Sequence, residues 1–441
     1  MSVQTELDAP DSATSKPVAG RLEAAFSLPA ATWTEFAAHA WERDTVVMPK
    51  VLAAPLVTSD EVLRTLLIAA EGCRAGKYDD VFTIWVGGKK LSEPMALLPE
   101  TQDPSLQGYL ERLHQRVGGA EFTILLANPH LYDEEIGRRT WRFLSGLFAH
   151  TGIPCGGTDT GLFLGRYTKT PFGVHRGQMS VMTFPVLGQK RFLLWPRGYG
   201  EQHADIRDSL AYDGHVAHAF ERIAGAGDVM YWPADFWHIA DDAIAYTAAF
   251  NIGFWWDRSP LQRAIYAFTD AVTTEAEAIS SIDRMADGRG ICLGTSDFAG
   301  PAMRQLPAEL EAAMQIVQRA CNGPMFGSIA LAEWLRFRSS NGLRDLPDPA
   351  PVPPARTDAL LVPIGPNAVV FSKNADGRLI VAANGRATVV ADHLQVRATL
   401  VELMAGRPAA FAEAGALDTG GEAIAKRLIE LMVTSRAAAI G

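Results

Sequence analysis

Two stretches decide the fold, GVHRGQMS at residues 173–180 and GDVMYWPADFWHIADD at residues 227–242. Each contains one histidine, His175 in the first and His238 in the second, close to glycines and apolar residues. A neutral imidazole is a good ligand for a first-row metal such as Fe(II). The chain has 10 histidines, and any single one is more simply explained as a packed core residue. The order of the segments around these two is what favours a metal site.

Short β-rich segments surround both histidines. Between about residues 155 and 257 the apolar runs are brief and are separated by glycine and proline, which is typical of a small barrel or sandwich. The clearest runs are GLFLGRYT, SVMTFPVLG, KRFLLWP, DVMYWP and AIAYTAAFNIGFWW. The sequence therefore predicts a β-rich core, with His175 just before its second run and His238 just after its fourth.

Amphipathic helices are expected on the N-terminal side of this core. Apolar residues have helical spacing in 58–73, 103–117 and 133–150, and this spacing predicts helices that bury one face. Ser59 or Asp60 is expected to cap the first of them.

The chain beyond the core divides into three pieces. Residues 258–343 have helical spacing, and residues 344–357 contain five prolines, a composition typical of a linker. In residues 358–441 we expect two strands, NAVVFSK and RLIVAANG, followed by two or three helices.

Composition narrows the function classes. The formal net charge is −10 and the chain has no run of Lys and Arg, so we expect no nucleic-acid partner. No apolar run is long enough to span a membrane, and the polar residues 1–20 lack a signal-peptide pattern and are expected to form a disordered leader. The 4 cysteines are widely spaced without a CxxC pair, which is typical of free thiols in a reducing cytosol. We therefore expect a cytoplasmic protein.

The motifs around the two histidines resemble the JmjC-type cupin oxygenases, double-stranded β-helix enzymes that use Fe(II) and 2-oxoglutarate. That family has H-x-D/E on one strand, a basic residue on a following strand, and a second histidine after a strand that begins with Gly-Asp. In this chain GVHRG, GQKRFLLWP and GDVMYWPADFWH follow the same order. The resemblance implies that His175 and His238 hold the iron, and that Lys190 pairs with the distal carboxylate of 2-oxoglutarate.

Further residues around this site follow from the same resemblance. Lys190 needs an anionic partner if it is buried, and strand alternation lets only one of Lys190 and Arg191 point inward. Asn251 and Tyr167 are expected to hydrogen-bond near the metal or the cosubstrate, with barrel packing as the alternative for Asn251. Three aromatic residues flank the second histidine, and we expect at least two of them to serve packing: Trp232, Phe236 and Trp237.

The resemblance extends beyond the barrel to the bacterial ribosomal-oxygenase architecture, in which a helical block mediates dimerisation. It implies a mixed α+β fold, a double-stranded β-helix barrel with N-terminal helices, a helical block and a C-terminal winged-helix-like domain, in a homodimer. The expected division of the chain is a leader (1–20), a catalytic domain (21–257) with its barrel core at about 155–257, a dimerisation block (258–343), a linker (344–357) and a winged-helix-like domain (358–441).

Gly177 departs from the family pattern, because the family has an acid at this place. Four explanations are open. The enzyme is a hydroxylase in which water fills the slot, as in the aspartyl β-hydroxylases, which have glycine here. A halide such as chloride fills it, as in the iron/2-oxoglutarate halogenases with H-x-G or H-x-A. A different acid takes over, or the barrel binds a ligand without turnover.

Three nearby acids are candidates for the replacement. Asp242 lies four residues beyond His238, and Asp241 and Asp235 are close to it in sequence. Gln178, next to the gap, has an amide that binds metals weakly and is expected to face outward.

We expect an Fe(II)/2-oxoglutarate-dependent hydroxylase that acts on an amino-acid side chain of a peptide or protein. A halogenase and a non-catalytic cupin binding module are the alternatives, and a free amino acid or a carrier-bound intermediate is the alternative substrate. A metal-only cupin would need further histidines. The nearest are His215 and His218, and nothing around them matches a metal-binding strand.

Overall fold

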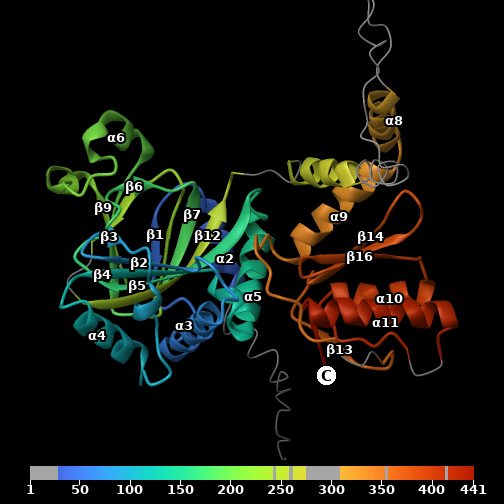
Figure 1. Ribbon diagram of the computed structural model, residues 1–441, viewed down its shortest axis with the longest axis horizontal. Helices are drawn as coiled ribbons and strands as arrows, with labels where there is room; N and C mark the ends of the chain where they lie inside the picture. The colour runs from blue at the N-terminus through green and yellow to red at the C-terminus, as the bar shows by residue number, and fades with distance from the viewer. Residues whose placement is uncertain (1–27, 242–244, 258–261, 275–307, 353–355, 413–415) are drawn as a thin grey trace, which may run out of the picture.

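The computed structural model describes residues 28–241, 245–257, 262–274, 308–352, 356–412 and 416–441 (Figure 1). A β-barrel covered by helices and a smaller C-terminal α/β unit lie side by side, with helical segments between them (Figure 1). The expected leader lies outside the described residues, as does much of the expected dimerisation block. No helix in the described ranges is long and apolar enough to cross a membrane.

The barrel consists of two antiparallel sheets that face each other. The larger sheet has the order β1 (Val46–Met48), β10 (Val229–Trp232), β7 (Met179–Leu187), β12 (Tyr246–Trp255), β5 (Gly157–Arg166), β4 (Phe122–Ala127), β2 (Phe82–Val86) and β3 (Lys89–Lys90). The smaller sheet has the order β6 (His175–Arg176), β11 (Trp237–Ala240), β8 (Gln189–Trp195) and β9 (Phe220–Gly225). Strands β1 to β4 precede the expected barrel core, so the larger sheet extends further toward the N-terminus than the sequence indicated.

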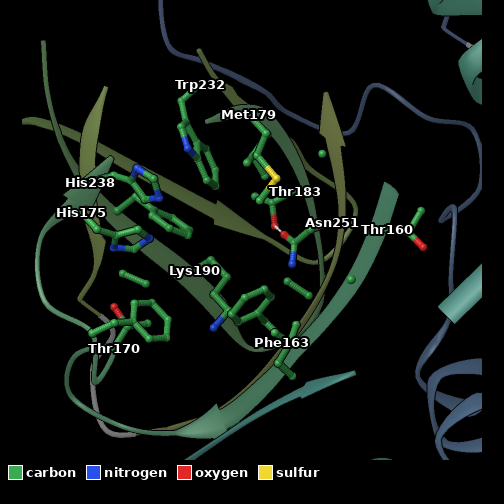
Figure 2. A pocket seen from close by; sticks show the side chains of 18 of the residues that line it. Thr160, Phe163, Thr170, His175, Met179, Thr183, Lys190, Trp232, His238 and Asn251 are labelled. Atoms are coloured by element: carbon green, nitrogen blue, oxygen red, sulfur yellow. Dashed lines mark hydrogen bonds between the residues drawn. The ribbon is translucent and has the colours of Figure 1, made fainter. Parts of the chain in front are cut away.

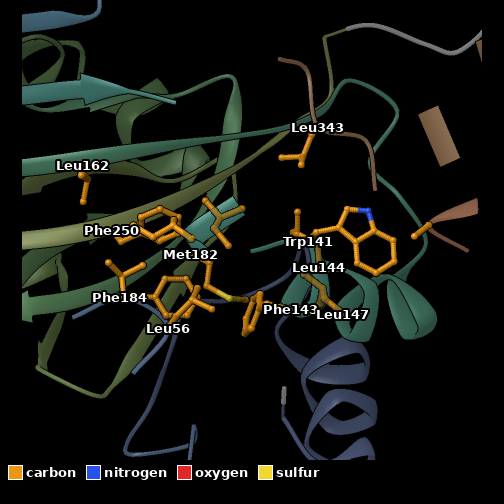
Figure 3. Packing of buried hydrophobic residues seen from close by; sticks show 14 of the residues in the cluster. Leu56, Trp141, Phe143, Leu144, Leu147, Leu162, Met182, Phe184, Phe250 and Leu343 are labelled. Atoms are coloured by element: carbon orange, nitrogen blue, oxygen red, sulfur yellow. The ribbon is translucent and has the colours of Figure 1, made fainter. Parts of the chain in front are cut away.

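The outer face of the larger sheet packs against helices. Leu162 on β5 and Phe250 on β12 are fully buried, and both belong to the same apolar cluster as Phe143 and Leu147 of α5 (Glu134–Thr151) (Figure 3). Because side chains alternate along a strand, the neighbours of these buried residues face the opposite way, into the barrel. Helix packing on one face therefore fixes which residues line the interior.

Three further helices come from the N-terminal part of the chain. They are α2 (Ala30–His39), α3 (Ser59–Arg74) and α4 (Leu106–Arg116), with short 3-10 turns at η1 (Met95–Leu97) and η2 (Pro129–Leu131). The expected cap of α3 was wrong by one residue. Thr58 is the cap, since its hydroxyl accepts from the Glu61 amide (3.4 Å) while the Glu61 carboxylate accepts from the Thr58 amide (2.9 Å).

The C-terminal part contains more strand than expected. Helices α8 (Ala308–Asn322) and α9 (Met325–Ser339) precede β13 (Leu361–Pro363), β14 (Val369–Lys373), β15 (Leu379–Ala383), β16 (Arg386–Val390), α10 (Leu394–Met404), α11 (Thr419–Thr434) and β17 (Ala438–Ile440). Strand β16 forms a hairpin with β15 through Asn384 and Gly385, both at positive φ. An Asn-Gly pair is a strong hairpin signal, so the sequence did contain the information for this strand.

Candidate active site

His175 and His238 lie next to each other on neighbouring strands. They are register partners in the β6–β11 pair, and their ring centroids are 4.4 Å apart. Nδ1 of His175 bonds to the Gly173 carbonyl (3.0 Å), and Nδ1 of His238 bonds to the Phe236 carbonyl (3.1 Å). A carbonyl can only accept, so each Nδ1 carries the proton and each Nε2 keeps its lone pair. The backbone thus orients two imidazoles with their metal-binding nitrogens free.

Burial keeps both imidazoles neutral. It lowers the pKa of His175, and burial together with the neighbouring His175 lowers the pKa of His238 to about 3. Protons therefore do not compete for the Nε2 lone pairs near neutral pH, and a neutral imidazole is the form that binds a transition metal.

Both histidines line a cavity of about 240 Å³ between the two sheets (Figure 2). Lys190, Tyr167 and Asn251 line the same cavity, so the structure brings together the five residues that were expected to hold the metal or the cosubstrate. Most of the remaining wall is apolar or small-residue surface, and it separates the polar groups from water.

Lys190 lies deep in this cavity, with a side chain that is only 2% exposed. Its Nζ donates to the Tyr167 hydroxyl and to Thr247 Oγ1 (2.8 Å), and lies 4.7 Å from the centroid of the Tyr167 ring. Arg191 points the other way, toward Glu221. An ammonium with two hydroxyls beside it is a good binding site for a carboxylate.

Asn251 occupies the opposite wall. Its Oδ1 accepts from the Thr183 hydroxyl, and both side chains point into the cavity (Figure 2). Since Oδ1 is engaged, the amide NH₂ is the group that Asn251 can offer to a ligand.

Gly177 lies in the turn between β6 and β7. A Cβ placed there would come within 3.3 Å of the Met179 carbonyl oxygen, so a side chain would fit after a small shift. Gln178 is exposed, as expected. In the described ranges no three His, Cys, Asp or Glu residues are placed to hold a metal together.

The candidate replacement acids differ in their positions. The Asp241 carboxylate accepts from the Tyr212 hydroxyl (2.7 Å) and pairs with Arg191 (3.1 Å), outside the cavity. Asp235 is exposed and does not line the cavity, and Asp242 lies outside the described residues.

Two further histidines that the sequence singled out lie away from His175 and His238. His215 and His218 are in η4 (Asp213–His218). This helix lies in the segment between β8 and β9, which also contains α6 (Arg197–Gln202) and η3 (Ala204–Ile206). Both histidine rings contact Tyr199. Among the three aromatic residues near His238, Trp232 lines the cavity and the other two do not.

Asp159 is a cavity residue that the sequence did not indicate. It shares the inner face of β5 with Gly161 and Phe163, and its register partner on β12 is Gly253. A Cβ on Gly253 would overlap the Asp159 carboxylate and approach Met179 Sδ to 2.7 Å. The glycine thus makes room for the acid inside the barrel. Burial raises the pKa of Asp159 to about 6.

Asp159→Asn is expected to stabilise the protein at high pH. The pKa of Asp159 rises from 3.8 to about 6 on folding. The folded protein therefore binds the Asp159 proton more tightly than the unfolded chain does, and its free energy of unfolding is highest below about pH 4 and falls as the pH rises through 6. That shift corresponds to about 3 kcal/mol. The urea midpoint of the variant should exceed that of the wild type at pH 8, and the two midpoints should agree at pH 4. Asp235→Asn, at an exposed acid, is the control, and an equal gain at both pH values for Asp159→Asn would contradict the expectation.

Comparison with known proteins identifies similar structures but no similar sequences. No family model and no curated protein matches this chain. A structure of the ribosomal oxygenase YcfD from Escherichia coli superposes with a TM-score of 0.51 at 17% identity, covering 92% of this chain and 97% of that chain. The two chains share a fold. A second crystal structure of Escherichia coli YcfD gives a TM-score of 0.50 at 16% identity, covering 93% and 98% of the two chains.

This fold confirms the class expected from the sequence. The chain is a mixed α+β protein with a JmjC/cupin-like barrel, and the similarity covers the parts on both sides of the barrel as well. A further YcfD structure, in complex with cobalt and 2-oxoglutarate, superposes with a TM-score of 0.49 at 18% identity, covering 92% and 98%.

Proposed function

We propose that this protein is an Fe(II)- and 2-oxoglutarate-dependent oxygenase that hydroxylates an amino-acid side chain of a peptide or protein. The observation that carries the proposal is a shared cavity, lined by two neutral histidines and by a buried lysine whose ammonium donates to the hydroxyls of Tyr167 and Thr247. Of the common site types, a metal held by two imidazoles and chelated by a dicarboxylate cosubstrate uses all of these groups.

Two residues in the cavity wall also have enclosed polar atoms. Within the described part of the chain, Thr170 Oγ1 and Trp232 Nε1 are buried and lack a hydrogen-bond partner, and both residues line the cavity. Buried polar groups are rarely left unpaired. The groups that support a polar occupant are the histidine pair and Lys190, which line the cavity and fit a metal and a keto acid.

Each group then has a physical task. His175 and His238 would hold the metal, with their rings fixed by the bonds from Nδ1 to the backbone. Lys190, with the Tyr167 and Thr247 hydroxyls, would bind the distal carboxylate. Fe(II) with 2-oxoglutarate would supply the activation of O₂ that the side chains cannot provide.

The rest of the cavity wall would exclude water from the reacting groups. Phe163, Phe172 and Phe192 line the cavity, and the Phe172 ring lies 5.0 Å from the His175 ring. Apolar walls strengthen the electrostatic interactions within the site, because they lower the local dielectric constant.

The same proposal includes a polypeptide substrate, a homodimeric state and a cytoplasmic location. A substrate within a polypeptide is supported by the fold shared with a ribosomal oxygenase. A homodimer is supported by exposed apolar side chains on the helical segments, namely Ile265, Tyr266, Met314, Val317 and Trp334. A cytoplasmic setting is supported by Cys73, Cys155 and Cys321, which are free thiols in the structure.

An anaerobic spectrum tests the function. Addition of Fe(II) and 2-oxoglutarate without oxygen is expected to give a visible charge-transfer band, which appears only when both are present. Oxygen should then discharge the band with formation of succinate. Absence of both the band and succinate would contradict the proposal and leave a cupin binding module. The same Fe(II) addition without 2-oxoglutarate is the control.

Halogenation is the second candidate, and Gly177 is the observation that favours it. A carboxylate at this position would occupy the metal site that a halide needs. The two candidates differ in whether a halide binds beside the metal.

A further inference from the structure

The residues next to the two histidines point away from the cavity, because the histidines themselves face into it. Val174 precedes His175 and is fully buried, and Ile239, which follows His238, is fully buried as well. Both belong to a small apolar cluster that is separate from the main core of the protein. The outer side of the histidine pair is therefore packed against another part of the chain.

This part is the segment between β8 and β9, residues 196–219, which contains α6, η3 and η4 (Figure 1). It contributes Ile206 and Tyr212 to the small cluster, and both are at most 2% exposed. Gly200 of α6 lies so close to the ring of Trp237 that a Cβ on it would overlap the indole. The segment thus shares a core with the residue before the first histidine and packs against the residue before the second.

Backbone hydrogen bonds join this segment directly to the strand of His175. The Val174 amide donates to the Ser209 carbonyl (2.9 Å), and the Asp208 amide donates to the Val174 carbonyl (2.7 Å). Gly173 has a φ of 68°, and a Cβ there would lie 2.8 Å from the carbonyl oxygens of Asp208 and Ser209. Because β6 spans only two residues, these bonds supplement its short pairing with β11 and fix where His175 enters the cavity.

Tyr212 joins the same segment to the strand of the second histidine. Its hydroxyl donates to the Asp241 carboxylate (2.7 Å), and Asp241 directly follows β11. Asp241 also pairs with Arg191 on β8 (3.1 Å), so its carboxylate is held from two sides, and a hydrogen bond to an ionised acceptor is a strong one. The segment therefore contacts both strands that carry a histidine, whereas these strands share only a two-residue pairing with each other.

We propose that the segment between β8 and β9 positions His175 and His238 for a shared metal, with Tyr212 as a positioning residue, and that metal binding in turn orders this segment. The inference rests on the proposed function, because the metal is the ligand that links the two histidines. The segment, which the structure describes in full, does not line the cavity. It would regulate the metal site from outside.

The small size of this unit is the reason for the coupling. Helix α6 has 6 residues, and a helix this short is not stable by itself. The cluster that holds the segment has few buried members, namely Val174, Leu193, Trp195, Ile206, Tyr212 and Ile239, and regions with few buried apolar contacts open more easily than the rest of a protein. A metal that links the two histidine strands fixes the surface on which the segment rests, and a ligand that binds only the closed form stabilises that form.

Tyr199 provides a matched control for Tyr212. Both belong to the same segment, and the Tyr199 hydroxyl also has a hydrogen-bond partner, Nδ1 of His215 (2.9 Å). That partner lies within the segment, whereas the Asp241 carboxylate lies at the end of a histidine strand. Tyr212→Phe and Tyr199→Phe therefore each remove one hydroxyl and keep the ring, and only the first variant loses a bond to a histidine strand.

Hydrogen exchange followed by mass spectrometry tests the coupling in the wild-type protein. Exchange is recorded for the full chain with and without Mn(II), a substitute for Fe(II) that is stable in air. Mn(II) is expected to slow exchange in residues 196–219 and to leave residues 369–390 of the C-terminal unit unchanged. Ordered segments exchange more slowly because their amides open less often.

Calorimetry with Mn(II) tests the role of Tyr212. The affinity is expected to fall about tenfold in Tyr212→Phe, since groups that orient a metal ligand contribute about 10–100-fold to metal affinity. It should stay within about twofold of the wild type in Tyr199→Phe. A role in folding alone would lower the melting temperature of Tyr212→Phe without changing the metal affinity of the folded protein.

The other outcomes separate this inference from the proposed function. A wild type that binds Mn(II) without slower exchange in residues 196–219 overturns the inference and leaves the proposed function standing. Equal Mn(II) affinities of Tyr212→Phe and Tyr199→Phe do the same. If Tyr212→Phe does not fold, the exchange experiment on the wild type decides alone. A wild type that binds neither Mn(II) nor Fe(II) overturns the proposed function and the inference with it.

Discussion

His238→Ala is expected to lower the affinity for Fe(II) by more than about 100-fold, since loss of an outer-shell partner alone costs about 10–100-fold. In the described residues no third His, Cys, Asp or Glu joins His175 and His238 to hold a metal, so the variant keeps one ligand of the proposed pair. His238 also packs 4.4 Å from His175 between ring centroids, and the orientation of the remaining ring would relax. Anaerobic calorimetry with Fe(II), and with Mn(II) as an air-stable substitute, measures the effect.

His215→Ala is the matched control for this loss. His215 lies in the segment between β8 and β9, away from the cavity, and bonds to the Tyr199 hydroxyl (2.9 Å) and to the Asp205 carboxylate (3.0 Å). Its removal should leave metal affinity unchanged within about twofold. If His238→Ala bound Fe(II) as tightly as His215→Ala does, the metal site would have to lie elsewhere. His238→Gln repeats the test with a side chain that fills the same space.

The proximity of His175 and His238 was predictable because the signal is local. His175 and His238 follow from short motifs, and Lys190 faces inward by the two-residue alternation of a strand. The strands that carry the histidines were harder to recognise, because β6 spans two residues and β11 spans four. Runs this short have no measurable periodicity, so only the motif order indicated them.

Asp159 shows what the sequence could not provide. It precedes His175 by 16 positions, and its place in the cavity depends on the pairing of β5 with β12, which puts it opposite Gly253. Register between distant strands is a tertiary property. The Asp-x-Gly-x-Phe alternation at 159–163 was present in the sequence, yet alternation alone does not say which face is inside.

The acids considered as replacements for the missing carboxylate show a second limit of prediction from sequence. Asp241 is near His238 in sequence, but the structure pairs it with Arg191 at 3.1 Å. Arg191 faces outward because Lys190 faces inward, so the inward lysine also determines where the acid goes. Proximity in sequence could not reveal this, whereas the alternation that placed Lys190 inside does explain it afterwards.

Lys190→Met is expected to weaken binding of 2-oxoglutarate by about 100-fold, because truncating one partner of a buried charge pair costs 2–5 kcal/mol. The Lys190 ammonium donates to Tyr167 and Thr247 at the inner end of the cavity, where a carboxylate would be shielded from water. Metal affinity should not change, since Lys190 does not contact the Nε2 atoms. The amplitude of the anaerobic band as a function of 2-oxoglutarate concentration measures the loss.

Arg191→Met separates this effect from a general loss of positive charge. Arg191 belongs to the same strand and pairs with Glu221 on the outside, so its removal should leave 2-oxoglutarate affinity within about twofold of the wild type. Unfolding is not expected to account for the effect of Lys190→Met, because methionine fills a similar volume and removes a buried charge. If Lys190→Met bound 2-oxoglutarate normally while His238→Ala lost the metal, the dicarboxylate would not be held by Lys190. Other residues of the cavity would then have to bind the distal carboxylate of 2-oxoglutarate.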